Sequence, residues 1–450
     1  MPLARSWPAQ RWRQERASGL ESMLEIQQLA SATVAAVVGG GRNLNAVLAA
    51  QWQKHPQLTS QQRGAITDLS YGTLRFGAQL EAVIAQLLEK PLRDESLRWL
   101  LLVALYQLQH TRAAPYAIVD NAVSCAARLG EPQAAGLINA VLRNFLRRGK
   151  ALLAKAACSD AGRYSYPQWW IDRLRAQYPQ HFAAMLEAGN LHPPFTLRVN
   201  RRRTTRDDYL ALLAQHGIAA TAVGAEAVTL ARALPVERLP GFADGRVSVQ
   251  DAAAQFAAPL LDAQDGMRVL DAFAAPGGKT THLSEIADLE LTALDSDATR
   301  LARVRQNLAR LRLDARLVVA DVNDTAAGWD GKPFERILAD VPCSASGVVR
   351  RHPDIKWLRR TSDIPQFVLQ QRRLLGSLWR LLASGGKLLY TTCSVFQEEN
   401  SLQVAEFLAR HRDARLLPLC GVVTVDGTPE GQLLPDNEHD GFYYALLQKM

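Results

Sequence analysis

From Ser248 onward, short apolar runs of strand character alternate with longer amphipathic segments of helical period. This alternation is typical of a mostly parallel β-sheet that carries helices on both faces. The expected strands are residues 269–271, 291–295, 316–321, 336–343, 387–394 and 442–447, and the expected helices are residues 298–311, 366–382 and 398–410. The second helix is expected to break at residues 384–386, before the next strand. The second half of the chain is therefore predicted to be an α/β domain.

The first half, from about Leu24 to Arg148, repeats apolar residues at helical spacing throughout. One such set is Leu97, Leu100, Leu101, Ala104, Leu105 and Leu108. Short breaks such as residues 112–115 separate the helices, so an all-α bundle is expected. Its last helix carries Arg143, Arg147 and Lys150 away from the apolar stripe, which suits either a solvated face or contact with RNA.

Five segments make up the predicted organisation. Residues 1–23 are rich in Arg and Trp and are expected to be a floppy basic extension rather than a targeting peptide. The helical bundle covers residues 24–150, and residues 151–192 form a helical connector. Residues 193–246 form a small α/β module with a strand at 195–200, a helix at 206–215 and a second strand near 227–230. Three arginines at 201–203 fit either phosphate contacts or charges guarding a strand edge. Residues 247–450 form the α/β domain.

Composition limits the partners and the cellular compartment that are expected for the protein. The formal net charge of +8 is compatible with a polyanionic partner, although many basic proteins have none. No apolar run approaches the roughly 20 residues of a membrane-spanning helix, so no membrane association is expected. The five cysteines include no Cys-x-x-Cys pair, which favours a reducing cytosol and hence a cytoplasmic protein.

Polar residues follow the expected strands at the point where each strand ends. They are Asp271, Asp295, Asp321, Asp340 and Cys393. In an open parallel sheet, ligands bind at the carboxyl ends of the strands. A single aspartate there is often only a turn residue, but several on one edge indicate a binding site. Asp295 is spaced to hold ribose hydroxyls, and Asp321 is placed for an adenine amino group.

The stretch from Val269 to Leu283 contains a glycine-bearing turn between a strand and a helix expected to open near Thr280. Gly277 and Gly278 let backbone approach a ligand closely. A phosphate-binding P-loop is excluded because its first glycine would fall at Phe273. The Gly-x-Gly-x-x-Gly spacing of dinucleotide sites is also absent, so the turn favours a ligand with one nucleoside and no phosphate. S-adenosylmethionine fits this description.

Two cysteines, Cys343 and Cys393, end neighbouring expected strands, and Asp340 precedes the first. Methylation of an amine needs no thiol, whereas carbon 5 of a pyrimidine becomes nucleophilic only after a thiolate adds to C6. An acid that holds a proton at N3 assists this addition. Cysteine is a common buried residue, but two thiols and an acid on one ligand edge favour covalent catalysis.

Three motifs carry a family resemblance: Ala-Ala-Pro-Gly-Gly-Lys-Thr-Thr-His at 274–282, Asp-Val-Pro-Cys-Ser-Ala-Ser-Gly at 340–347, and Tyr-Thr-Thr-Cys-Ser at 390–394. Together they resemble the RNA 5-cytosine methyltransferases of the Sun/Nop family. Residues 115–123 and 138–143 resemble the NusB family of RNA-binding helical domains. With residues 241–251 and 350–357, they narrow the likeness to a bacterial subgroup that methylates cytosine 967 of 16S rRNA.

The resemblance implies a multidomain fold, with an all-α NusB-like bundle followed by a Rossmann-like class I methyltransferase domain. It implies that Cys393 is the nucleophile, that Cys343 assists product release and that Asp340 is catalytic. The cofactor, S-adenosylmethionine, would be bound by Phe273, Ala274, Ala275, Pro276, Gly277, Gly278, Lys279, Asp295, Asp321 and Asp340. DNA cytosine methyltransferases use the Pro-Cys cysteine as nucleophile, so the two thiol roles rest on the family likeness alone.

Two positions depart from the family pattern. Phe273 replaces a usual cysteine, and Tyr116 stands where NusB-like domains often carry histidine. The resemblance implies 16S rRNA as partner, either free or in an early small-subunit particle, with no metal and a monomeric enzyme. The same chemistry on another RNA such as a tRNA stays open, as does a non-catalytic ribosome-assembly factor.

Overall fold

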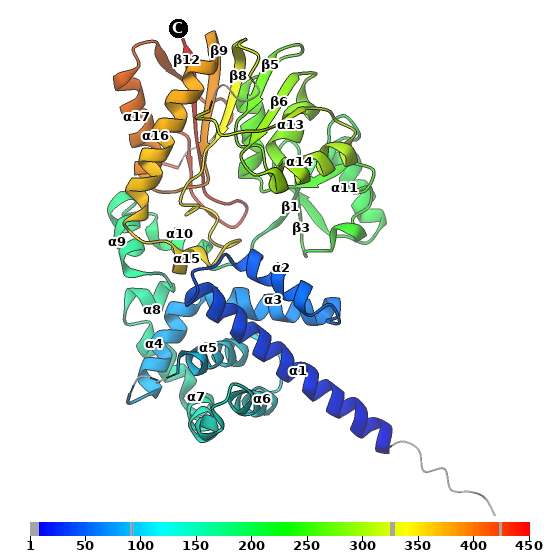
Figure 1. Cartoon of the computed structure of the whole chain (residues 1–450), viewed down its shortest axis with the longest axis vertical. Helices are drawn as coiled ribbons and strands as arrows, with labels where there is room; N and C mark the ends of the chain where they lie inside the picture. Colours follow the sequence, from blue (N-terminus) through cyan, green and yellow to red (C-terminus); the bar gives the residue numbers. More distant parts are fainter. Residues whose placement is uncertain (1–8, 91, 93, 325–328, 423–424) are drawn as a thin grey trace, which may run out of the picture. The chain divides into compact units, whose positions relative to one another are not determined.

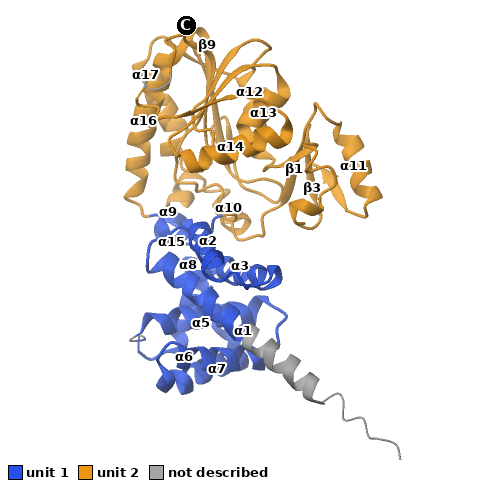
Figure 2. Cartoon of the chain, turned by 45° about the vertical axis from the view of Figure 1, so that its right-hand side comes forward, with its two compact units in different colours: residues 1–172, 352–359 blue, residues 173–351, 360–450 orange. Residues whose placement is uncertain are grey.

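The structure of the chain is a computed structural model (Figure 1). It describes the backbone of residues 9–90, 92, 94–324, 329–422 and 425–450, and their side chains from residue 23 onward. Two compact units are distinguished in Figure 2. Unit 1 extends to Asp172 and includes His352–Arg359, and unit 2 comprises Arg173–Arg351 and Arg360–Met450.

Unit 1 is helical, as the sequence predicts. Its helices are α1 (Ala9–Val38), α2 (Leu44–Lys54), α3 (Ser60–Arg75), α4 (Gly77–Leu87), α5 (Glu95–His110), α6 (Pro115–Arg128), α7 (Ala135–Ala156), α8 (Asp160–Tyr164) and α15 (Ile355–Leu358). Helix α5 is buried almost all round, because its apolar residues leave no polar stripe. Helix α1 begins at Ala9, inside the expected floppy extension, while residues 1–8 lie outside the described residues.

The segment His352–Arg359 is distant in sequence from the rest of unit 1 but packs within it. Asp354 Oδ2 accepts hydrogen bonds from the backbone N–H of Leu44, at 3.1 Å, and from Asn43 Nδ2, at 3.2 Å. Trp357 Nε1 donates to the carbonyl of Leu74 at 2.9 Å. The sequence prediction assigned these residues to the segment 247–450, because nothing in a linear pattern reveals such a long-range contact.

Unit 2 contains a small antiparallel sheet in the strand order β2-β3-β1-β4. Its elements are β1 (Phe195–Val199), α11 (Arg206–Gln215), β2 (Ala220–Ala222), β3 (Ala227–Leu230) and β4 (Val247–Val249). Tyr209 and Leu213 of α11 are fully buried in the core of this module. The sequence predicted β1, α11 and β3, but β2 and β4 have only three residues each and show no period.

The large sheet of unit 2 has the order β10-β12-β9-β8-β5-β6-β7, with β11 paired to β12. Its strands are β5 (Arg268–Asp271), β6 (Glu290–Asp295), β7 (Arg316–Val319), β8 (Phe334–Asp340), β9 (Leu382–Thr392), β10 (Ala414–Leu417), β11 (Gln432–Leu433) and β12 (Phe442–Lys449). Strands β5 to β9 pair in parallel, and β12 pairs antiparallel with β9. The expected parallel sheet is therefore confirmed, with an antiparallel edge.

Helices cover both faces of this sheet (Figure 1). They are α12 (Ala257–Leu261), α13 (Gly278–Ile286), α14 (Ala298–Leu311), α16 (Asp363–Leu381) and α17 (Ser401–Arg410). Because side chains of a strand alternate, Ile337 and Ala339 of β8 pack in the core with α16 and α17. Leu338 faces the opposite core, with α12 and α13. Within the described residues, no helix has the length and apolar character needed to cross a membrane.

Several boundaries differ from the sequence prediction; the expected strand 336–343, for example, is β8, which ends at Asp340, three residues before Cys343. Strand β9 begins at Leu382 and runs through the expected break at residues 384–386. The expected helix 398–410 is divided into the 3₁₀ helix η4 (Gln397–Glu399) and α17 by Asn400, whose φ of −117° and ψ of −108° are not helical. The side chain of Asn400 donates to the carbonyl of Ser394 at 2.9 Å, so this residue serves the loop after β9 instead of continuing a helix.

Candidate active site

Four of the five predicted polar residues lie at one edge of the large sheet. Asp271, Asp295 and Asp340 are the last residues of β5, β6 and β8, and Cys393 follows the end of β9. The strand register aligns these ends, since Asp340 pairs with Thr391 and Asp271 pairs with Leu338. Asp321 lies two residues beyond β7. The carboxyl ends of the strands thus form one polar edge, as predicted.

The turn after β5 brings backbone to this edge. Gly277 has φ of +101°, which favours glycine, and a Cβ there would lie 3.1 Å from Val304 Cα. Helix α13 begins directly afterwards at Gly278, two residues before the predicted start near Thr280. Thr280 Oγ1 donates to Asp271 Oδ2 at 2.6 Å. Burial raises the pKa of Asp271 to about 6. Its hydrogen bond with Thr280 ties the end of β5 to the first turn of α13 inside the protein.

The side chain of Phe273 packs against the hydrophobic core between the sheet and α16. The resemblance implies a cysteine at this position, and a phenyl ring is compatible with the fold because it packs on apolar side chains.

Asp295 is buried and keeps capacity to accept further hydrogen bonds. Its Oδ2 accepts from the N–H of Ala275 at 3.2 Å, and its Oδ1 accepts from the N–H of Asp297 at 3.0 Å. Arg300 Nη1 lies 3.6 Å from Oδ1, and a carboxylate has about four acceptor sites, so the side chain can accept further hydrogen bonds. Asp321 Oδ1 accepts from the N–H of Asn323 at 2.8 Å and is exposed to solvent.

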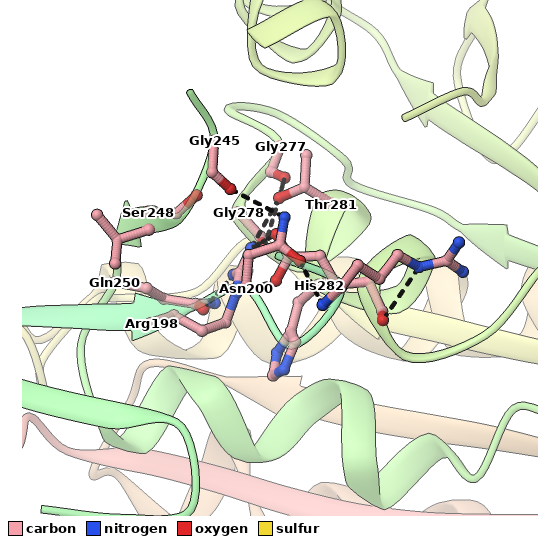
Figure 3. Close-up of polar contacts among 12 residues, drawn as sticks. Arg198, Asn200, Gly245, Ser248, Gln250, Gly277, Gly278, Thr281 and His282 are labelled. Carbon is pink, nitrogen blue, oxygen red and sulfur yellow. Dashed lines mark hydrogen bonds and ion pairs between the residues drawn. The ribbon is translucent and has the colours of Figure 1, made fainter. Parts of the chain in front are cut away.

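Arg198 of β1 holds the glycine turn from below and was missed by the sequence prediction (Figure 3). Its guanidinium binds both oxygens of Glu285, at 2.9 and 2.8 Å. It also donates to the carbonyl of Gly278 at 2.7 Å, to Thr281 Oγ1 at 3.0 Å and to Gln250 Oε1. All five N–H groups are used, and the side chain is fully buried. A charged residue between the buried Leu197 and Val199 was the signal available in the sequence.

The two predicted thiols lie side by side, Cys343 in the loop that follows β8 and Cys393 in the loop that follows β9. Cys343 Sγ and Cys393 Sγ are 3.4 Å apart, and both residues are half-buried. The contact with the Cys393 sulfur, together with burial, raises the pKa of Cys343 well above its ordinary value. The Cys343 side chain is therefore favoured as the neutral thiol.

Lys279 and Asp340 form an ion pair close to the thiols. Lys279 Nζ lies 2.5 Å from Asp340 Oδ2 and 5.4 Å from the ring centre of Phe442. Burial opposes the charge of Lys279, but Asp340 outweighs burial and the net pKa of the amine is raised. The side chain of Asp340 is 28% exposed, so a ligand can reach it.

Unit 1 carries exposed basic residues on its last long helix, α7. Arg143, Arg147 and Lys150 are exposed on α7, and Tyr116 of α6 is 71% exposed. Of the arginines at 201–203, Arg202 Nη2 lies 2.7 Å from Asp288 Oδ1 and its Nε donates to the carbonyl of Glu285 at 3.2 Å. The α7 side chains are available for contact with a polyanion.

The described residues contain no group of three or more His, Cys, Asp or Glu side chains that is arranged to hold a metal ion.

Three segments of the chain match known families. Residues 25–147 match the NusB family, and residues 166–237 match a ferredoxin-like domain described as RsmF/B-like. Residues 258–448 match the family described as 16S rRNA methyltransferase RsmB/F.

Individual relatives cover almost the whole chain. The ribosomal RNA small subunit methyltransferase B of Pseudomonas putida is 48% identical over 428 residues, which cover 94% of this chain and 98% of that protein. The protein of the same name from Escherichia coli O127:H6 is 43% identical over 440 residues, which cover 96% and 100%.

Solved structures show the same architecture. The crystal structure of PH0851 has a TM-score of 0.76 at 24% identity and covers 94% of this chain and 99% of its own, which shows a shared fold. A methyltransferase homologue from Pyrococcus horikoshii has a TM-score of 0.56 at 30% identity, covering 64% of this chain and 97% of its own.

Proposed function

Because the chain belongs to the RsmB/F family of 16S rRNA methyltransferases, we propose that it methylates C5 of a cytosine in 16S rRNA, at position 967. The observation that carries the proposal is the pair of sulfur atoms 3.4 Å apart beside the Lys279–Asp340 ion pair. Methyl transfer to a nitrogen or oxygen needs no thiol, whereas covalent activation of C5 can use one thiol for attack on C6 and the other for release of the product.

S-adenosylmethionine is the methyl donor, and the residues at the sheet edge fit it. The glycine turn at 273–279 admits backbone close to the methionine portion, and Asp295 has free acceptor sites for the ribose. Asp321 lies one strand further along for the adenine amino group, and the exposed part of Asp340 faces the same edge. When bound, the sulfonium supplies an electrophilic methyl group.

Cys393 acts as the nucleophile. Its thiolate forms a bond to C6 of the cytosine and displaces the electrons of the C5–C6 double bond toward N3. When these electrons return to C5, that carbon becomes the nucleophile. Asp340, with Lys279 beside it, holds a proton at N3 and so stabilises the activated ring. C5 then takes the methyl group as the bond between that methyl and the sulfonium sulfur breaks. A base removes the C5 proton, which restores the double bond as the bond between the Cys393 sulfur and C6 breaks, and Cys343 assists this release.

The remaining segments bind the RNA substrate or connect the domain that binds it to the methyltransferase domain. Residues 24–150 bind RNA through the basic side chains of α7, while the connector at 151–192 and the module at 193–246 join this domain to the methyltransferase domain at 247–450. The substrate is free 16S rRNA or an early small-subunit particle, and the enzyme acts as a monomer in the cytoplasm, where ribosomes are made.

Mapping of 5-methylcytosine tests the proposed product. Bisulfite sequencing of 16S rRNA from cells with and without this protein should show one protein-dependent 5-methylcytosine, at position 967. Purified protein should restore the mark on unmodified 16S rRNA and leave tRNA unmodified. Methylation confined to tRNA, or a product methylated at another atom of the base, would contradict the proposal.

A further inference from the structure

Each of the two thiols is followed in sequence by a buried serine, and both serines contact one carboxylate. Ser344 follows Cys343 and Ser394 follows Cys393, and neither serine is exposed. The carboxylate is that of Glu399 in η4, which is also fully buried. A single acidic side chain therefore joins the loop after β8 to the loop after β9.

Glu399 accepts four hydrogen bonds. Its Oε1 accepts from the N–H of Ser344 at 2.8 Å and from Gln371 Nε2 at 3.0 Å. Its Oε2 accepts from the hydroxyls of Ser344, at 2.5 Å, and Ser394, at 2.6 Å. An ionised carboxylate is an acceptor only and offers about four positions, so the donors fill it completely. Burial raises the pKa of Glu399 and so favours its protonated form, but these donors favour the anion.

Further contacts make the connection between the loops rigid. The N–H of Gly347 donates to the carbonyl of Cys393 at 2.8 Å. The Nε2 of Gln371 also donates to the carbonyl of Pro342, immediately before Cys343, at 3.0 Å. A Cβ at Gly347 would lie 2.1 Å from the carbonyl oxygen of Gly441, so the backbone is closely packed at this point. Among these contacts, the carboxylate of Glu399 is the charged member of the connection.

We propose that Glu399 is a positioning residue that fixes the separation and orientation of the Cys343 and Cys393 thiols. This inference rests on the proposed function and adds to it. The four hydrogen bonds of Glu399 go to groups other than the thiols, and it acts on them through the two serines. A thiolate that attacks C6 must be held within a fraction of an ångström, and a misplacement of about 1 Å costs on the order of 100-fold in rate.

The test uses Glu399→Gln, which keeps the size of the side chain but replaces one acceptor oxygen with an N–H₂ donor. If that donor faces the two hydroxyls, both must turn round and accept, so the charge-assisted hydrogen bonds to the anion are replaced by weaker neutral ones. If it faces the Ser344 N–H and Gln371 instead, donors face donors and those two bonds are lost. We expect kcat to fall by about 100-fold. The KM for S-adenosylmethionine should change less than about twofold, because Asp295 and the glycine turn are untouched.

The covalent step is measured in the full-length Cys343→Ala enzyme, which is expected to accumulate a protein–RNA adduct. Adding Glu399→Gln should slow the formation of this adduct by a similar factor. Glu398→Gln is the matched control, because Glu398 is half-exposed and binds Gln177 and not the thiol loops. Adduct formation as fast with Glu399→Gln as with the control overturns the inference and leaves the proposed function intact.

Failure of the reference enzyme has a different meaning. If Cys343→Ala itself forms no adduct, the proposed covalent mechanism is wrong, whatever Glu399 does.

Should Glu399→Gln not fold, as judged by loss of S-adenosylmethionine binding in calorimetry, Ser394→Ala decides the question. It keeps the carboxylate and its bonds to Ser344 and Gln371, and it removes the bond from the Cys393 loop to Glu399 together with the contacts of the Ser394 hydroxyl with Ser344, Ser346 and the Phe396 N–H. It should therefore slow adduct formation. An unchanged rate in folded Ser394→Ala overturns the inference.

Discussion

Replacement of Arg198 by methionine tests how the small module supports the cofactor turn. Arg198 is fully buried, its five N–H groups are all used, and its partners lie on α13 and at Gln250. Methionine has a similar length and fills much of the same space. The main effect of Arg198→Met is therefore to leave the buried carboxylate of Glu285 without its arginine donor, while the carbonyl of Gly278 loses one of its hydrogen bonds.

The expected magnitude follows from the burial of the pair. Removing one partner of a buried ion pair costs about 3–5 kcal/mol, because the remaining charge is stranded away from water. Burial already raises the pKa of Glu285, with Arg198 opposing the shift, so loss of the arginine should drive this carboxyl toward its protonated form. The double variant Arg198→Met/Glu285→Leu removes the stranded charge and should recover about 2 kcal/mol or more of the loss.

Hydrogen exchange followed by mass spectrometry at increasing urea measures the local free energy of unfolding. Peptides from β1 and α13 should lose about 3–5 kcal/mol in Arg198→Met, while peptides from α7 in unit 1 serve as internal reference. Arg202→Met is the matched control, since its partner Asp288 is 79% exposed and the pair should contribute less than about 1 kcal/mol. A double variant no more stable than Arg198→Met would refute the reasoning.

Three further outcomes follow from the site and the surface. Asp295→Ala should weaken S-adenosylmethionine binding by about 10- to 100-fold in calorimetry, through loss of charge-assisted hydrogen bonds to the ribose. Unchanged affinity would remove Asp295 from the site. Replacing Arg143 and Arg147 with alanine should weaken RNA binding and reduce the slope of log K against log salt by about 0.7–0.9 for each phosphate that is no longer neutralised. An unchanged slope would make that face merely solvated. Burial lowers the pKa of His282 to about 4, so the stability it contributes is present above pH 6.5 and is lost as the pH falls from 6.5 through 4. Wild type should thus lose about 3 kcal/mol across this range in urea unfolding, and His282→Gln should lose less; equal losses would contradict the assignment.

The sequence predicted those features that depend on a repeated local pattern. The parallel sheet followed from alternating strands and helices, and α11, α14 and β3 begin and end at the predicted residues. The polar sheet edge followed because the carboxyl ends of parallel strands lie at the same edge of the sheet. The family resemblance, which combined three motifs with a NusB-like first domain, is confirmed by the matches across the chain.

Features that depend on contacts between distant residues could not be predicted. Arg198 lies in an ordinary-looking strand, and its importance comes from Glu285, which is 87 residues away. Asn400 interrupts a good helical pattern because its side chain binds the loop after β9. The buried role of Glu399 was hidden for the same reason, since Glu398 and Glu399 look alike in sequence but differ in burial.

The covalent RNA adduct tests the central claim most directly. Full-length Cys343→Ala and Cys393→Ala enzymes are incubated with labelled, unmodified 16S rRNA and S-adenosylmethionine, and the mixtures are separated by denaturing electrophoresis. Attack by Cys393 followed by blocked release predicts a labelled protein band for Cys343→Ala and none for Cys393→Ala. A band for Cys393→Ala without one for Cys343→Ala, or methylation that persists in Cys393→Ala, would contradict the account.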